Sequence, residues 1–223
     1  MSTEALEERK STVPALAPTP ATEITAEDVS LPRVYIGQFI SNAVQHGLVK
    51  AGQIFVALGA DDPDPQTVYD PEAKDTAKLG RGLLFHPIAL RKGKSLQVDG
   101  RLETWQFEDP SAPKEAWTTY TYLIAIPEID TDVPAKWLLT RSGKPAALQI
   151  NTVLKKNASK GSIWLNAFRA TTDWRENEKG KFAVPRIRPA EASTKDVELA
   201  ERFAVELSGS SADVKATGDE PEL

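Results

Sequence analysis

Apolar and polar residues alternate along much of the chain between residues 33 and 189, which is the pattern of β-strands with one buried face. These stretches are bounded by Gly, Pro, Asp and Asn, the residues typical of turns. The strands that the pattern predicts are 33–40, 53–58, 82–90, 95–108, 116–127, 135–142, 162–172 and 180–189. Pro87 should lie at an edge or a bulge. A bend at Asp99-Gly100 is expected, and 95–108 and 116–127 could form a hairpin.

Two segments have the spacing of amphipathic helices instead. The first spans 145–157 and begins with Pro145, which is favourable in the first turn of a helix. The second spans 193–207, where Ser193 and Asp196 can form a capping box. Frequent turns between short strands favour a mainly β fold, an antiparallel barrel or sandwich with one or two helices, over a parallel α/β sheet.

The two ends of the chain differ in composition from the middle. Residues 1–28 and 208–223 are acidic, rich in Pro, Ala, Ser and Thr, and have no apolar face, so we expect both to be disordered. Their net charges are −4 and −3, whereas 29–207 carries +2. The sequence thus predicts one domain, 29–207, between a disordered acidic arm and a disordered acidic tail.

Positive charge is concentrated in residues 136–188, which hold twelve Lys and Arg against three acids. A basic body with acidic ends is the charge pattern most often associated with a polyanion partner. The alternative is a basic face that is merely solvated.

The sequence lacks the residues that several kinds of chemistry require. The chain has no cysteine, which excludes disulfides, thiolate catalysis and zinc ribbons, and only two histidines, His46 and His86. Phosphate-binding glycine loops and the nucleophile elbow are missing from it as well. We therefore expect no enzyme, no cofactor and no metal. No apolar run approaches the ~18 residues of a membrane span, and the first ten residues do not resemble a signal peptide. We expect a cytoplasmic protein that does not bind membranes.

An acidic, Pro-rich loop is expected over 59–80. Its carboxylates could hold a hard cation such as Mg²⁺ in a nuclease-like enzyme. The loop lacks the spacing and the glycine of a calcium loop, however, so a solvated loop is the favoured interpretation. These carboxylates belong to Asp61, Asp62, Asp64, Asp70, Glu72 and Asp75.

Cations and flat rings together indicate binding of a single nucleic-acid strand, because cations contact phosphates and aromatic rings stack on bases of any sequence. Core packing is an equal alternative for Trp137 and Trp164, whereas Trp174 has polar neighbours and should be exposed. The predicted nucleic-acid-binding residues are Trp105, Trp117, Trp137, Arg141, Lys144, Lys155, Lys156, Trp164, Arg169, Trp174, Arg175, Lys179, Lys181 and Arg186.

Over residues 28–207 the chain resembles the single-stranded DNA-binding proteins of tailed bacteriophages. The similarity lies in Leu31-Pro32-Arg33 with Gln38 after an acidic arm, Ala51-Gly52 before a strand, Trp137-Leu138-Leu139-Thr140, Ser142, Lys144, Ala147, Asn151, and the turn from Asn177 to Gly180 that leads into Phe182 and Val184.

The resemblance implies an OB-like β-barrel that binds single-stranded DNA with little sequence preference, in phage DNA replication or recombination in the host cytoplasm. It makes the acidic tail a candidate for recruiting replication or recombination proteins, although this tail ends in Leu223 and not in the aromatic residue common on such tails. Self-association is left open. The alternative function is a phage virion accessory or assembly protein that uses the β-domain to dock another protein.

Overall fold

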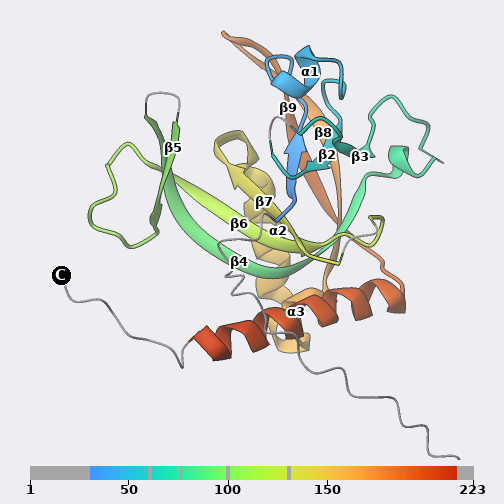
Figure 1. Cartoon of the computed structure of the whole chain (residues 1–223), viewed down its shortest axis with the longest axis vertical. Coiled ribbons are helices and arrows are strands. Elements are labelled where there is room, and N and C mark those ends of the chain that lie inside the picture. Colours follow the sequence, from blue (N-terminus) through green and yellow to red (C-terminus); the bar gives the residue numbers. More distant parts are fainter. Residues whose placement is uncertain (1–30, 60–61, 76, 99–100, 130–131, 215–223) are drawn as a thin grey trace, which may run out of the picture. The chain divides into compact units, whose positions relative to one another are not determined.

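The computed structural model describes residues 31–59, 62–75, 77–98, 101–129 and 132–214 (Figure 1). The predicted acidic arm, 1–28, and residues 215–223 of the predicted tail lie outside these ranges.

The described residues confirm a mainly β fold, whose nine strands form one mixed sheet in the order β3-β2-β1-β7-β6-β4-β8-β9, with β5 paired to β4. Among the described pairs only β1 and β7 run parallel, with Arg33 opposite Lys136. The strands are β1 (Arg33–Ile36), β2 (Ile54–Ala57), β3 (Gln66–Tyr69), β4 (Leu83–Val98), β5 (Arg101–Gln106), β6 (Trp117–Ala125), β7 (Ala135–Thr140), β8 (Ala167–Asn177) and β9 (Gly180–Ala190).

The longest strand, β4, holds the two parts of the sheet together. Leu83–Phe85 pair with β8, whereas the rest of the strand pairs with β6 and then with β5. The register against β6 shifts between Pro87 and Ala89, so Pro87 lies at a bulge as predicted. The strand curves strongly along its length (Figure 1), which allows it to pair with strands in both parts of the sheet.

The sheet does not close into a barrel, because no ladder joins its edge strands β3 and β9 within the part of the chain described. The predicted OB barrel is therefore seen only as a β-rich open sheet. A side chain spans part of the opening. The amide of Gln38, just after β1, donates from Nε2 to the Ala183 carbonyl and accepts from the Ala183 N–H, both at 2.9 Å.

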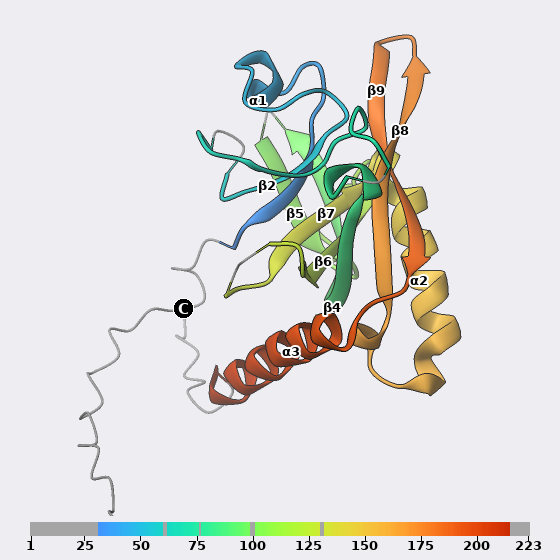
Figure 2. The ribbon, with the colours of Figure 1, turned by 90° about the vertical axis from the view of Figure 1, so that its right-hand side faces the viewer.

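The main core lies inside the curved sheet, and α2 (Lys144–Asn157) packs against it through Ala146, Ala147 and Ile150. Pro145 occupies the first turn of α2, as predicted. Figure 2 shows α2 beside β8 and β9. A short helix, α1 (Asn42–Gln45), precedes β2.

A second, smaller core lies under α3 (Thr194–Val214), which crosses β4 and β6 (Figures 1 and 2). The predicted capping box is present. The Ser193 amide donates to Oδ2 of Asp196 at 2.8 Å, and the Asp196 amide donates to Oγ of Ser193 at 3.4 Å. The helix continues past the predicted end at 207, so the first seven residues of the predicted tail are helical. No helix in the described ranges is long and apolar enough to cross a membrane.

Several predicted boundaries were wrong. The predicted loop 59–80 contains β3, which pairs with β2. The segments 82–90 and 95–98 form one strand, because Arg91–Lys94 continue to pair with β6. β6 pairs with this strand and not with β5, so the hairpin is β4–β5. The strand predicted from 162 begins only at Ala167, after a 3-10 turn over Ile163–Leu165.

Candidate nucleic-acid interface

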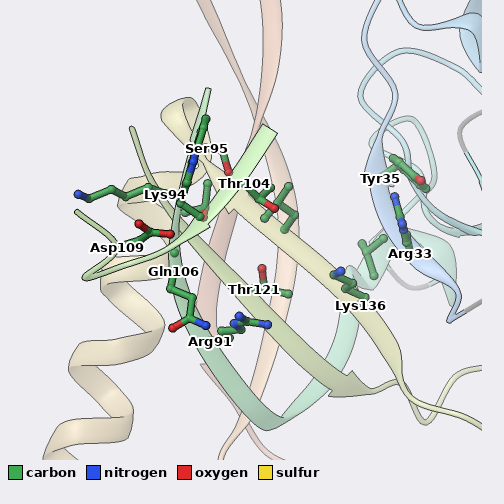
Figure 3. A pocket seen from close by; sticks show the side chains of 15 residues that line it. Arg33, Tyr35, Arg91, Lys94, Ser95, Thr104, Gln106, Asp109, Thr121 and Lys136 are labelled. Carbon is green, nitrogen blue, oxygen red and sulfur yellow. The ribbon is translucent and has the colours of Figure 1, made fainter. Parts of the chain in front are cut away.

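A groove of about 740 Å³ crosses the outer face of β1, β7, β6 and β4. The β4–β5 hairpin forms one wall and β1 the other (Figure 3). Its lining comprises Arg33, Val34, Tyr35, Arg91, Gly93, Lys94, Ser95, Thr104, Trp105, Gln106, Asp109, Thr119, Thr121, Lys136 and Leu138.

Strand alternation places polar side chains on this face, because successive residues of a strand point to opposite sides. On β7, Trp137 and Leu139 are buried in the core, while Lys136 and Leu138 line the groove. On β6, the core residue Tyr122 follows Thr121 in the same way. The core that holds the sheet together therefore also fixes which residues face the groove.

Three cations face the groove, one from each of three strands. Arg33 lies on β1, Lys136 opposite it on β7, and Arg91 on β4. The side chain of Lys94 points away from the groove (Figure 3), because that of the next residue, Ser95, faces it. None of the three cations lies within ion-pair distance of a carboxylate in the described ranges. Their charges are therefore available to an anionic ligand.

Asp109 is the single carboxylate among the described residues of the lining. Its Oδ1 atom accepts from the hydroxyl of Ser111 at 2.6 Å and from the Ser111 amide at 2.8 Å. These hydrogen bonds, with a smaller contribution from Lys94, hold the pKa of the Asp109 carboxyl below its usual value. Asp109 is thus ionised at neutral pH, and three cations still outnumber one carboxylate.

One aromatic ring stands on the β1 wall of the groove. Tyr35 on β1 stacks on the buried Phe55, with ring centroids 5.4 Å apart. Trp105 on β5 is half-buried, and its register opposite Lys94 points its side chain to the other side of the hairpin. Cations beside accessible aromatic rings are the components that single-strand binding needs.

Of the predicted binding residues, only Trp105 lines this groove. Trp137 was predicted as a binding residue with core packing as the alternative, and it lies in the core. It is 2% exposed and meets Phe85 edge to face at 5.4 Å. Trp164 is half-buried against the smaller core under α3. Neither ring faces the groove, because the large aromatic surfaces of both fill the interior.

Three predicted arginines have other partners. Arg169 donates to the Gly82 carbonyl at 2.7 Å and lies 3.4 Å from Oε1 of Glu128, so it links β8 to the chain beside β4. Arg186 pairs with Asp173 at 3.5 Å. Arg141 stacks over the Trp117 ring, its Cζ atom 4.4 Å from the ring centroid.

The β8–β9 hairpin carries a separate group of predicted residues, namely Trp174, Arg175, Lys179 and Lys181. Trp174 is 36% exposed and stacks on Phe39 with centroids 5.3 Å apart, while Nζ of Lys181 lies 4.9 Å from the Trp174 ring. Its ring also touches the backbone at Gly52, where an added Cβ would come within 2.9 Å of it. Trp174 thus packs the hairpin against the segment after β1.

A second hollow, of about 590 Å³, lies between the start of α2 and this hairpin. Its charged lining residues are Arg175, Arg186, Asp173 and Glu176. Two cations are balanced there by two carboxylates, so this hollow suits a polyanion less well than the groove does.

The remaining predicted lysines lie on α2 and are exposed. Lys144 begins the helix, and Lys155 and Lys156 occupy its last turn, where cations complement the helix dipole. None of the three lines the groove.

Sequence reasoning missed Arg33, Tyr35 and Arg91 and did not select Lys136. The search followed the density of charge along the chain, whereas the groove takes one or two residues from each of several strands. The alternation of Arg33 and Tyr35 with the apolar residues between them was the available signal.

The carboxylates of the acidic loop mostly hold their own backbone. Asp62 accepts from the amides of Leu58 and Asp64, and these bonds lower the pKa of its carboxyl. Asp70 accepts from the Gln53 side chain, and Glu72 pairs with Lys50 at 2.6 Å. Over the described part of the loop and the rest of the fold, no three His, Asp or Glu side chains are grouped to hold a metal ion.

Comparisons with protein-family models, with curated proteins and with solved structures found no match to this chain.

Proposed function

We propose that this chain binds single-stranded DNA without catalysis, along the groove on the outer face of β1, β7, β6 and β4. One observation carries the proposal: among the described residues, three cations without an ion-pair partner outnumber one carboxylate in a groove that has the Tyr35 ring on one wall. Cations supply sequence-independent affinity for phosphates, and each base stacked on an aromatic ring adds ~1–3 kcal/mol.

We also propose that the sheet binds DNA in the manner of an OB fold. This proposal is supported by the curvature of β4, which pairs with both β6 and β8, and by the contact of Gln38 with β9 across the opening. The sequence resemblance supports a role in phage DNA replication or recombination in the host cytoplasm.

The proposal is tested by reversing charge inside and outside the groove. Arg91→Glu with Lys136→Glu should weaken binding of a labelled oligo-dT more than tenfold, as measured by fluorescence anisotropy. The matched control, Lys155→Glu with Lys156→Glu, makes the same change in net charge on α2. Across about 50 to 200 mM salt, each lost phosphate contact should flatten the salt dependence by about 0.7 in log–log slope.

Equal weakening by both double variants would show that only net charge matters and would overturn the assignment of the groove. Circular dichroism of each variant shows whether the fold is retained.

A second candidate function, docking of another protein, is favoured by a different surface. Phe39 and Ile40, between β1 and α1, are 54% and 84% exposed, and Trp174 extends this apolar surface. Exposed apolar side chains that lie together mark interaction surfaces. Failure of the wild-type protein to bind oligo-dT at low salt would favour this function.

A further inference from the structure

A tryptophan on the groove side of β6 lies next to the residues that line the groove. Trp117 is the next residue of β6 beyond Thr119 on the groove side of the sheet, directly opposite Ser95 of β4. Both Ser95 and Thr119 line the groove. A strand of nucleic acid that followed the groove would therefore reach Trp117 at its end.

One face of the Trp117 ring is covered by a side chain that can move. The guanidinium of Arg141 stacks on the ring with Cζ 4.4 Å from its centroid, and Arg141 is exposed. Its backbone has φ +45°, the left-handed region, and no other non-glycine residue in the described ranges has positive φ. Strained backbone of this kind is concentrated at ligand-binding sites.

Polar atoms around this ring lack partners. Oγ of Ser95, Nε1 of Trp117 and Oγ1 of Thr140 are all buried, and each lacks a hydrogen-bond partner among the residues that the structure describes. Ser95 is fully buried and lies on the wall of the groove. Indole N–H is a donor only and hydroxyls can donate, so the three atoms together suit the oxygen atoms of a ligand.

We propose that Trp117 forms a subsite for one nucleotide of the bound strand. The base takes the place of the Arg141 guanidinium on the indole ring, and the released guanidinium pairs with a phosphate. The indole N–H of Trp117 and the hydroxyls of Ser95 and Thr140 donate hydrogen bonds to oxygen atoms of the same nucleotide. This inference rests on the proposed function of the groove and adds a position at which a base displaces a protein side chain.

The test compares two oligomers of equal length and charge, oligo-dT and an oligomer of abasic sites. Trp117→Leu, which keeps apolar volume but removes the flat ring, should weaken oligo-dT binding about 5- to 150-fold, the loss of one base–aromatic stack. It should change abasic-oligomer binding less than about twofold. Trp117→Phe keeps a ring and should bind oligo-dT more tightly than Trp117→Leu.

Arg141→Gly adds an independent readout, since it removes the guanidinium at a backbone conformation that glycine adopts freely. The salt dependence of oligo-dT binding should flatten by about 0.7, the loss of one phosphate contact. An unchanged slope, or equal effects of Trp117→Leu on both oligomers, would overturn the subsite. If the wild-type protein binds neither oligomer, the proposed function itself fails. If the wild-type protein binds oligo-dT with an affinity that depends on Arg91 and Lys136, but the Trp117 or Arg141 variants give the contradicting result, only the subsite fails.

Discussion

At the scale of single residues, the buried His86 couples stability to pH. Its Nδ1 atom lies 2.8 Å from the Trp164 carbonyl and therefore carries the proton, while Nε2 is buried without a partner in the described ranges. Protonation would place a second N–H where nothing accepts it. Burial lowers the pKa of His86, and the Trp164 carbonyl and the charge of Asp196 oppose this more weakly.

We expect acid to destabilise the fold through this residue. Above pH about 6.5 the ring is neutral in both the folded and the unfolded chain. As the pH falls below that value the unfolded chain binds a proton that the folded chain excludes, so stability drops by up to about 1.4 kcal/mol per pH unit, until the folded pKa is reached. His86→Gln should lose this part of the pH dependence of the urea midpoint. His46→Gln changes an exposed histidine and serves as the control; identical profiles for His86→Gln and wild type would contradict the account.

The same residue scale shows where sequence interpretation succeeded and where it stopped. The capping pair Ser193 and Asp196 and the bulge at Pro87 could be predicted because each depends on local chemistry. Trp137 could not be assigned to either role from the sequence, since a tryptophan can pack in a core or stack on a base. Only its contact with Phe85 and its burial under the sheet show that it is a core residue.

At the scale of elements, the contact between Gln38 and Ala183 joins the edge strand β9 to the segment just after β1. The Gln38 amide satisfies both the N–H and the carbonyl of Ala183 on the free edge of β9. Nothing local in the sequence predicts this pairing, because the two residues are 145 positions apart.

We expect Gln38→Ala to lower the free energy of unfolding by about 1–3 kcal/mol, since it leaves part-buried backbone groups of β9 without a partner. Hydrogen exchange at the Ala183 amide should accelerate more than at Ala170 in the middle of β8. Gln45→Ala, at an exposed position on α1, is the control. Unchanged protection of Ala183 would show that the contact does not hold the edge of β9.

The arrangement of the elements also explains why the sequence pattern did not predict the groove. Charge density along the chain pointed to residues 136–188, but much of that charge lies on α2, on the β8–β9 hairpin and in ion pairs. The groove cations come from β1, β4 and β7. These strands lie far apart in the sequence, and the local pattern of residues does not predict how they pair.

At the scale of the whole molecule, we expect the acidic residues 215–223 to compete with DNA for the proposed binding groove. Because α3 continues through Val214, the truncation that tests this removes 215–223 only and leaves the helix intact. Truncation should tighten oligo-dT binding, most at low salt, where the Debye length reaches ~30 Å at 0.01 M against ~10 Å at 0.1 M. Equal affinities of the two proteins at both salt concentrations would leave these residues without a role in binding.

The claim that the groove is the DNA-binding surface is tested most directly by photocrosslinking. The full chain would be irradiated with an oligo-dT that carries 5-iodouracil, and the crosslinked peptides identified by mass spectrometry. The account predicts crosslinks to Tyr35 in the groove, and none to Trp164 under α3. Crosslinks confined to Phe39 and Trp174, with none in the groove, would contradict it.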